Sequence, residues 1–418
     1  MGGYVITGGR SLSGEIAVSG AKNALLPILA ASILNDKEIV IHDCPDISDA
    51  ENMIEILRTL GCSVKREGNT LVIDASNANA YTMPPNISKK IRSSIFMLGS
   101  VLGRFKRARF TYPGGCEIGN RPIDLHLDGL KKLNVRIKEE YGYIDCWGED
   151  MRGASIHLDY PSVGATENIM MAAVAARGDS VIQNAAREPE IEDLERFLNE
   201  LGFSVSGAGT STVCIKGGGV TRRAEHTVIP DRIVAGTLLC AAAATRGDVL
   251  VTNVDTGHIS LTLSKLNEMG CDISARRDTV RLKAPERLRR IKLLETLPYP
   301  GFPTDMQAQM FALCSIADGT SVIVENVFDN RFKHAAELKR MGADITLKDR
   351  TAVISGVERL TGATMFARDL RGGAALVIAG LCADGRSVVY GNEYVDRGYE
   401  RFENMLGALG ADIDKFEA

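Results

Sequence analysis

A glycine-rich segment in the first third of the chain holds a cysteine and an arginine suited to acid–base chemistry. It reads PGGCEIGNRPIDLH, with three glycines close to Cys116 and with Arg121 shortly after them. Thiols beside a guanidinium group or a helix N-terminus often have lowered pKa values and react near neutral pH. Loops of this kind frequently carry functional residues. We therefore predict that Cys116 is an acid–base or nucleophilic group on a mobile loop covering about residues 112–125.

Charged and polar side chains also lie at the starts of predicted helices, where free backbone N–H groups attract anions. A cation there opposes the helix dipole, so its presence indicates a ligand rather than helix stability. We predict that these helix starts share one face and bind a small polyanionic molecule, for which phosphate is the best-fitting chemistry. The residues concerned are Lys22, Asn23, Arg92, Gly164, Asp231, Asp305, Arg331, Arg371 and Arg397.

Some of these residues also have a purely structural interpretation. An aspartate at a helix start is most often an N-cap, which is the preferred interpretation of Asp43 and Asp231. Asp305 fits either role from its position alone. Arg371 closely follows Asp369, and its guanidinium group could simply pair with that carboxylate.

Composition excludes several classes of protein. The 418 residues carry a net charge of only −4, which argues against a general nucleic-acid binder. The chain has no apolar run of the roughly 18 residues that a membrane span needs, and its start lacks a signal-peptide core. The nine cysteines form no C-x-x-C pair and the six histidines no H-E-x-x-H motif, so we expect neither a disulfide framework nor a metal site. This cysteine usage favours a reducing cytoplasm.

Internal repeats indicate the elements that must position these residues. A helix end, a Gly or Asn suited to a left-handed C-cap, and a β-hairpin recur about every 70 residues. Each copy follows a helix rich in Ala, Gly and Leu and a short apolar strand. A helix that is apolar on nearly all sides is a buried one. The buried helices are predicted at 21–34, 91–103, 165–178, 231–247, 304–319 and 369–385.

The sixth repeat lacks its last strand, because only four residues follow LGADID. Residues 1–20 align with the ends of other repeats, so we predict that the N-terminus pairs beside the C-terminus. Three repeats would then form a domain at 21–229, and three a second domain of 1–20 with 230–418. A single six-repeat solenoid is the alternative, although solenoid repeats are usually 20–45 residues long.

Taken together, the motifs closely resemble those of the UDP-N-acetylglucosamine 1-carboxyvinyltransferase family of enolpyruvyl transferases. The resemblance runs along the whole chain and rests on SGAKNALLPILAA, PGGCEIGNRPIDLH, SVGATENIMMAA, IPDRIVAGT, GFPTDMQAQ, DNRF, DLRGGAALVIAGL and DRGYER. It implies an α/β (α+β) fold of two inverted α/β-barrel-like domains. Each would hold three helix-strand-helix-hairpin repeats around buried helices, with the active site in the cleft between the domains.

The resemblance also implies an activity. It is the transfer of the enolpyruvyl group of phosphoenolpyruvate to the 3′-hydroxyl of UDP-N-acetylglucosamine, with release of phosphate, at the first committed step of peptidoglycan synthesis. The implied proton donor is Cys116, which can also form a pyruvate adduct, and the implied proton acceptor is Asp305. No cofactor or metal is implied, and no nucleic-acid or membrane partner.

The resemblance assigns the remaining site residues by their matching positions. Lys22, Arg121 and Arg397 would surround phosphoenolpyruvate, with Asn23 bridging both substrates. Arg331 and Arg371 would be supporting charges. The implied contacts of the UDP-sugar are Asn23, Arg92, Arg121, Pro122, Ile123, Asp124, Leu125, Ser162, Val163, Gly164, Asp305 and Val327.

Three other functions stay open at this stage. The related transferase that acts on shikimate 3-phosphate shares the fold and cationic cleft, but it lacks the cysteine loop with RPIDLH. A catalytically silent scaffold protein would be expected to lose Lys22, Cys116, Asp305 or Arg397, and all four are present. An RNA-modifying cyclase built from a related repeat would need a basic surface, which the net charge disfavours.

Overall fold

The computed structural model describes residues 1–114 and 123–417, and it divides into two compact units. The chain changes unit after Ser19 and again after Ile229. We call residues 20–114 with 123–229 the central unit, and residues 1–19 with 230–417 the terminal unit. Each unit has its own apolar core. Among the helices in the described ranges, none combines the length and apolar composition needed to span a bilayer.

Helices buried on nearly all sides form the middle of each unit, as the repeats predict. In the central unit they are α1 (Lys22–Ala31) with η1 (Ser32–Leu34), η2 (Arg92–Ile95) with α4 (Phe96–Phe105), and α6 (Val163–Ala173). In the terminal unit they are α8 (Arg232–Ala244), η4 (Thr304–Met306) with α10 (Gln307–Cys314), and α12 (Leu370–Cys382).

Small residues let these inner helices approach one another closely. A Cβ atom added at Gly99 of α4 would lie 2.1 Å from the carbonyl oxygen of Asn168 in α6, so only glycine fits there. The Asn168 side chain closes the same contact, because its Oδ1 accepts a hydrogen bond from the Gly99 N–H. The Ala- and Gly-rich composition that predicted buried helices is therefore a consequence of helix-to-helix packing.

Amphipathic outer helices complete the repeats. Each is followed by the predicted left-handed residue, at Gly61, Asn134, Gly202, Gly270, Gly342 and Gly410. These helices are α2 (Ser48–Thr59), α5 (Asp124–Lys132), α7 (Pro189–Glu200), α9 (Ser260–Glu268), α11 (His334–Arg340) and α14 (Phe402–Ala408). Shorter helices are α3 (Pro85–Ser88), η3 (Thr256–Ile259) and α13 (Asn392–Val395).

The central unit carries three small sheets, one for each repeat. Their strand orders are β13-β3-β5-β4, β6-β8-β7 and β11-β12-β10-β9. The strands are β3 (Ile39–His42), β4 (Ser63–Glu67), β5 (Thr70–Asp74), β6 (Arg107–Thr111), β7 (Arg136–Glu140), β8 (Tyr143–Trp147), β9 (Ser155–His157), β10 (Ser180–Gln183), β11 (Ser204–Ser206), β12 (Thr212–Lys216) and β13 (Ala224–Thr227).

The terminal unit repeats this arrangement with the orders β15-β16-β14-β2, β17-β18-β20-β19 and β21-β22-β1-β23. The strands are β1 (Gly3–Thr7), β2 (Ser13–Ala17), β14 (Asp248–Thr252), β15 (Asp272–Ala275), β16 (Thr279–Lys283), β17 (Leu293–Glu295), β18 (Thr320–Val324), β19 (Asp344–Lys348), β20 (Thr351–Ser355), β21 (Thr364–Phe366), β22 (Arg386–Tyr390) and β23 (Asp412–Phe416).

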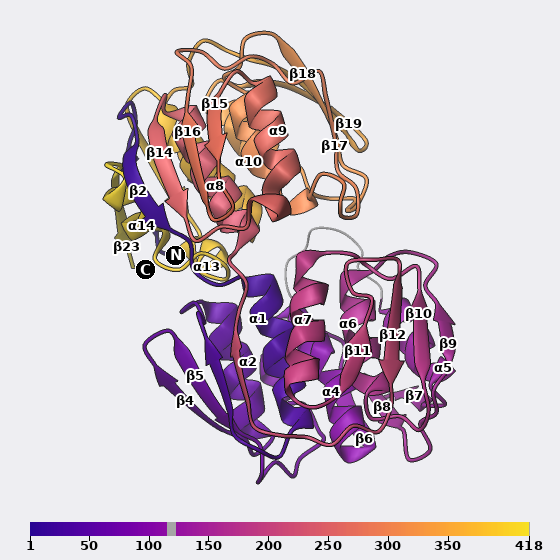
Figure 1. Cartoon of the computed structure of the whole chain (residues 1–418). Coiled ribbons are helices and arrows are strands. Elements are labelled where there is room, and N and C mark those ends of the chain that lie inside the picture. Colours follow the sequence, from indigo (N-terminus) through magenta and orange to yellow (C-terminus); the bar gives the residue numbers. More distant parts are fainter. Residues whose placement is uncertain (115–122, 418) are drawn as a thin grey trace. The chain divides into compact units, whose positions relative to one another are not determined.

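The two chain ends complete one repeat together, as predicted from the missing last strand. β1 pairs antiparallel with β23, with Gly3 opposite Phe416, and on its other side with β22. Figure 1 shows indigo β2 and yellow β23 in the same unit. β1 therefore supplies the return strand that the sixth repeat lacks.

Two edge strands lie just before the points where the chain passes from one unit to the other, and the repeats alone do not predict how they pair. β2 precedes α1 of the first repeat, yet it pairs in parallel with β14 of the fourth. β13 precedes α8 of the fourth repeat, yet it pairs in parallel with β3 of the first. Each edge strand thus stays in the unit that the chain is about to leave.

The two aspartates interpreted as N-caps differ in the structure. Asp231 is the N-cap of α8, since its Oδ1 accepts hydrogen bonds from the Ile233 and Val234 N–H groups. The interpretation is wrong for Asp43, because α2 begins only at Ser48. Asp43 instead has a left-handed backbone (φ 57°), and its carboxylate accepts a hydrogen bond from Asn69.

A buried histidine joins β13 to α7 in the central unit. His226 Nδ1 lies 2.8 Å from a Glu200 oxygen, and its Nε2 forms an ion pair with Asp193 at 3.2 Å. Burial alone would lower the pKa of His226, but the nearby Asp193 and Glu200 outweigh it and raise the pKa to about 9. The imidazolium is therefore the native form at neutral pH.

We expect this contact to make the central unit less stable in mild alkali. Unfolded histidine titrates near 6.5, so the stabilisation is complete below that pH and is lost as pH rises through about 9. Glu200 is partly exposed, so we expect a loss on the order of 2 kcal/mol. The measurement is urea unfolding between pH 6 and 10, followed by the fluorescence of Trp147, the single tryptophan.

The His226→Gln variant should lose this pH dependence. His42→Gln is the matched control, because His42 pairs with Glu225 at the surface, where an ion pair contributes little. If His226→Gln keeps the wild-type slope between pH 6.5 and 9, the proposed role of the imidazolium is wrong.

Candidate active site

Asp305 lies between two buried guanidinium groups in the terminal unit. Its Oδ1 accepts a hydrogen bond from Arg331 at 2.7 Å, and its Oδ2 accepts one from Arg371 at 3.1 Å. The side chains of Arg331 and Arg371 are each 3% exposed, whereas that of Asp305 is 26% exposed. Two nearby cations favour the ionised carboxylate. The structure therefore presents a negatively charged, oriented carboxylate that solvent can still reach.

Two inner helices and one loop bring these three residues together. Asp305 lies in η4, immediately before α10, and Arg371 lies in the first turn of α12. α10 and α12 pack against each other, and the hydrogen bond from Arg371 to Asp305 joins their N-terminal ends. Arg331 comes from the loop between β18 and α11, where its guanidinium carbon lies 5.3 Å from the centre of the Phe328 ring.

Arg371 does not use Asp369 in the way that their sequence spacing suggested. Asp369 is the N-cap of α12 and accepts hydrogen bonds from the backbone N–H groups of Arg371 and Gly372. The Arg371 guanidinium reaches Asp305 instead. Burial alone would lower the pKa of Arg371, but Asp305, Tyr399 and Asp231 together outweigh it, so the pKa is raised and the cation persists.

A second carboxylate, the buried Glu325, connects Asp305 to the loop of Val327. Glu325 accepts hydrogen bonds from the hydroxyl groups of Thr296 and Thr304, the latter next to Asp305 in the chain. It also accepts the Val327 N–H at 2.9 Å. Val327 is thus tied to the element that carries Asp305, a link that the sequence analysis missed.

Lys22 has an acidic neighbour in the central unit. Its Nζ lies 2.8 Å from the Asp49 carboxylate, and both side chains are almost completely buried. Lys22 and Asn23 begin α1, and Asp49 lies in the first turn of α2. The acidic first turn of the outer helix was the available signal for Asp49, but nothing in the sequence paired it with Lys22.

The other central-unit residues lie at the starts of three further helices. Arg92 begins η2, and burial lowers its pKa. Ser162 is the N-cap of α6, where its Oγ accepts the Ala165 N–H, and Val163 and Gly164 form the first turn. Ile123 is the N-cap residue of α5, which begins with Asp124 and Leu125.

Asn168 joins these helix starts. Its Nδ2 donates to the Ile95 carbonyl at the end of η2 and lies 3.0 Å from Nδ1 of His126 in α5. A Cβ at Gly164 would lie 3.1 Å from the His126 ring, so the start of α6 packs directly on α5. The structure thus groups η2, which begins with Arg92, with Gly164 of α6 and the start of α5. The sequence analysis missed Asn168.

Arg397 lies in the turn between α13 and α14 of the terminal unit, five residues before α14 begins. The prediction that it sits at a helix start is wrong in this detail. Its neighbour Asp396 holds the turn, since it accepts hydrogen bonds from Asn392, Tyr4 and Lys415. Cys116, Arg121 and Pro122 lie outside the described residues.

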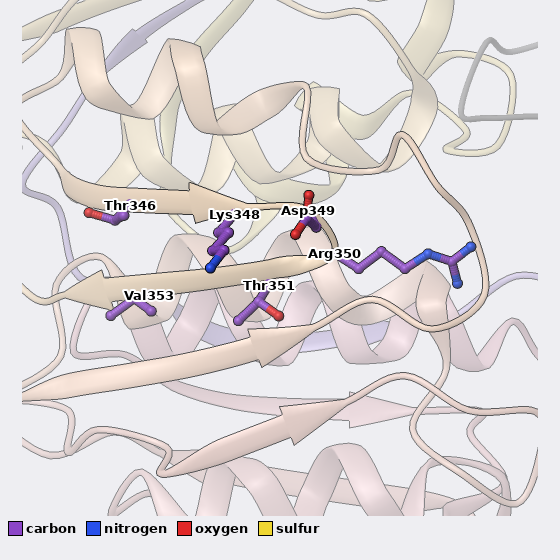
Figure 2. Close-up of a pocket in the computed structure, with 6 residues that line it drawn as sticks. All are labelled: Thr346, Lys348, Asp349, Arg350, Thr351 and Val353. Carbon is purple, nitrogen blue, oxygen red and sulfur yellow. The ribbon is translucent and has the colours of Figure 1, made fainter.

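An open hollow of about 550 Å³ lies on the β19–β20 hairpin (Figure 2). Arg350 at its edge pairs with Asp329. The side chains that line it are Thr346, Lys348, Asp349, Arg350, Thr351 and Val353, and no predicted site residue is among them. Within residues 1–114 and 123–417, no group of three His, Cys, Asp or Glu side chains is placed to hold a metal ion.

Comparison with known proteins identifies the family. Residues 6–406 match the family model of EPSP synthase (3-phosphoshikimate 1-carboxyvinyltransferase). The chain is 54% identical to UDP-N-acetylglucosamine 1-carboxyvinyltransferase 2 of Caldanaerobacter subterraneus subsp. tengcongensis, with 99% of each chain covered. It is 51% identical to UDP-N-acetylglucosamine 1-carboxyvinyltransferase 1 of Symbiobacterium thermophilum, covering 99% of this chain and 95% of that protein.

Solved structures agree with this assignment. The enolpyruvyl transferase NikO from Streptomyces tendae superposes with a TM-score of 0.90 at 26% identity, with 100% of this chain and 99% of that chain covered. EPSP synthase from Acinetobacter baumannii has the same fold, with a TM-score of 0.77 at 18% identity and full coverage of both chains. The fold and the sequence comparisons agree: the chain has the mixed α/β fold with repeated small sheets, and about half of its residues are identical to those of its relatives along the full length. The chain therefore belongs to the enolpyruvyl transferase family, among the UDP-N-acetylglucosamine 1-carboxyvinyltransferases.

Proposed function

We propose that this protein transfers the enolpyruvyl group from phosphoenolpyruvate to the 3′-hydroxyl of UDP-N-acetylglucosamine and releases phosphate. This is the UDP-N-acetylglucosamine 1-carboxyvinyltransferase reaction (EC 2.5.1.7), the first committed step of peptidoglycan synthesis. The observation that carries the proposal is the nearly full-length likeness, at about half identical residues, to transferases of that name. Every site position of the matching motifs holds the expected residue.

Asp305 is the proton acceptor in this proposal. In the addition step, the sugar 3′-oxygen bonds to the enol carbon of phosphoenolpyruvate, and its proton passes to Asp305. The two guanidinium groups leave the carboxylate ionised and hold both its oxygens in place. A fixed, partly exposed carboxylate of this kind suits a general base.

Cys116 and Lys22 are the acidic partners. The methylene carbon of phosphoenolpyruvate takes up a proton from Cys116 as the new C–O bond forms. In the elimination step that carbon returns a proton to the Cys116 thiolate, the double bond re-forms, and phosphate leaves with the electron pair of the broken C–O bond. Lys22, Arg121 and Arg397 balance the charge of the phosphate and carboxylate throughout, since fixed cations stabilise charge without reorganising.

The UDP-sugar is bound, in this proposal, by the helix starts of the central unit together with residues of the terminal unit. The former include Asn23, Arg92, Ser162, Val163 and Gly164, and the segment from Arg121 to Leu125. The latter are Asp305 and Val327. We propose that both units act on the same substrates, and that each unit is the inverted α/β-barrel-like domain implied by the family motifs.

A cytoplasmic location fits this activity. The eight described cysteines are all free thiols, which is usual in a reducing compartment. The substrates are soluble anions, and the reaction as written needs no oxidant, reductant or cofactor.

The second candidate function is enolpyruvyl transfer to shikimate 3-phosphate, which the description of the matching family model favours. The discriminating experiment is a phosphate-release assay with phosphoenolpyruvate and either acceptor. We expect turnover with UDP-N-acetylglucosamine to exceed that with shikimate 3-phosphate at least ~1,000-fold, because a site built to bind one polar acceptor leaves its groups unpaired with the other. Turnover with shikimate 3-phosphate alone would overturn the proposal.

A further inference from the structure

Tyr399 lies where the three inner helices of the terminal unit meet, behind Arg371. It is 1% exposed, so it is enclosed by protein rather than placed on the surface that Asp305 shares with solvent. The Arg371 guanidinium carbon lies 5.4 Å from the centre of its ring. The ring also packs on Phe402, with the ring centres 4.7 Å apart.

The Tyr399 hydroxyl is anchored on two inner helices. Its oxygen lies 2.9 Å from Oγ1 of Thr237 in α8 and accepts a hydrogen bond of 3.3 Å from Nε2 of Gln309 in α10. The same Gln309 nitrogen also donates to Thr237 Oγ1 at 3.0 Å. Thr237 and Gln309 are completely buried. The Tyr399 hydroxyl thus contacts both α8 and α10, while the ring of the same residue lies against Arg371 of α12.

The direction of these hydrogen bonds follows from the donors available. Thr237 Oγ1 lies 2.7 Å from the Ile233 carbonyl, which can only accept, so the single Thr237 hydrogen is used there. The Tyr399 hydroxyl must then donate to Thr237. Burial raises the pKa of Tyr399, so it keeps this proton at neutral pH. The phenol oxygen can then accept hydrogen bonds from N–H groups such as that of Gln309.

We propose that Tyr399 is a positioning residue for the enolpyruvyl transfer, with its ring and anchored hydroxyl holding the Arg371 guanidinium in line with Asp305. This inference rests on the proposed role of Asp305 as the base. Tyr399 itself is enclosed and acts only through Arg371. Because Gln309 lies in α10 and Asp305 lies in η4 immediately before it, the same hydroxyl bonds also fix the start of α10 beside α8.

The test compares the kcat and KM of Tyr399→Phe with those of the wild type in the phosphate-release assay. Phenylalanine keeps the ring but removes the hydroxyl. We expect kcat to fall about 10- to 100-fold, since a small misplacement of a catalytic group has effects of this size. KM for both substrates should stay within about twofold, because Tyr399 contacts neither substrate.

Further variants separate positioning from simple loss of packing. Thr237→Val removes the anchor at constant shape and should lower kcat in the same way, whereas Thr237→Ser retains the hydroxyl and should restore it. The double variant Tyr399→Phe with Thr237→Val should be no slower than the slower single variant. Ser315→Ala is the matched control, because it deletes a buried hydroxyl bond to the Phe311 carbonyl in α10 without contact to this network.

Crystal structures of wild type and Tyr399→Phe give a readout that does not depend on turnover. We expect the distance from Arg371 Nη2 to Asp305 Oδ2 to increase from 3.1 Å to beyond hydrogen-bond range. A variant with wild-type kcat, or with this distance unchanged, would overturn the inference. A wild type that is inactive with UDP-N-acetylglucosamine would instead contradict the proposed function, and the crystallographic distance would still test the alignment.

Discussion

Replacing Cys116 by serine should reduce phosphate release about 100- to 10,000-fold, the range typical of a lost general acid. A serine hydroxyl is a far weaker acid than a thiol, so it cannot supply the proton that the methylene carbon needs as the C–O bond forms. Steady-state kinetics with phosphoenolpyruvate and UDP-N-acetylglucosamine measure this loss. Binding of UDP-N-acetylglucosamine should be nearly unchanged, which isothermal titration calorimetry can check.

Two further variants make this prediction specific to the acid. Cys116→Asp provides a different acidic group at the same place and should retain much more activity than Cys116→Ser. Cys214→Ser is the matched control, since Cys214 is an exposed free thiol on β12, and its loss should leave turnover within about twofold. Full activity of Cys116→Ser would refute the role assigned to this cysteine.

Asp305→Asn should lower kcat by a similar factor, about 100- to 10,000-fold, because the amide cannot accept the sugar proton. The substitution preserves shape, so the arginines stay close to it. The carbonyl of the introduced amide can still accept from one guanidinium group, but its NH2 group would face the other. Two donors would then oppose each other at a site where both arginine side chains are only 3% exposed.

The same substitution should also destabilise the terminal unit by about 2 kcal/mol. Removing one partner of a buried charge pair leaves the other charge uncompensated, and the partial exposure of Asp305 moderates that penalty. Thermal unfolding followed by circular dichroism measures the shift, and activity should be assayed well below the transition. The control is Asp248→Asn, which breaks an exposed pair with Arg281 and should change neither quantity appreciably.

The outcome for Asp305→Asn is informative in either direction. A large loss of kcat in a protein that is still folded at the assay temperature supports the base role. Wild-type kcat, even with reduced stability, would mean that Asp305 only neutralises Arg331 and Arg371, and another group would have to accept the sugar proton.

Local sequence was a good guide to the elements of the fold. The inner helices were predictable because each must be small and apolar on nearly every side to pack among its neighbours. The ends of the outer helices were predictable because a left-handed C-cap favours Gly or Asn, and all six such residues have positive φ angles. The pairing of β1 with β23 was predictable from the return strand that the sixth repeat lacks.

The crossings between units were less predictable in detail. The local sequences of β2 and β13 do not predict that each strand pairs with a strand of a distant repeat. β2 pairs with β14, more than 230 residues away in the chain, and β13 pairs with β3, more than 180 residues away. Such register depends on which sheet edge is free when the unit is assembled, and not on local propensity.

The sequence by itself determined the family, the repeat pattern and the chemical types of the candidate site residues. Side-chain chemistry and short-range backbone preferences depend only on the residues and their neighbours in the chain. Only the tertiary structure decided that Arg371 pairs with Asp305 rather than with Asp369, that Lys22 meets Asp49, and that Tyr399 stands behind Arg371. Buried charges take whichever partner the packing of helices brings within about 3 Å. That choice depends on helix positions contributed by residues far apart in the chain, so spacing along the sequence cannot supply it.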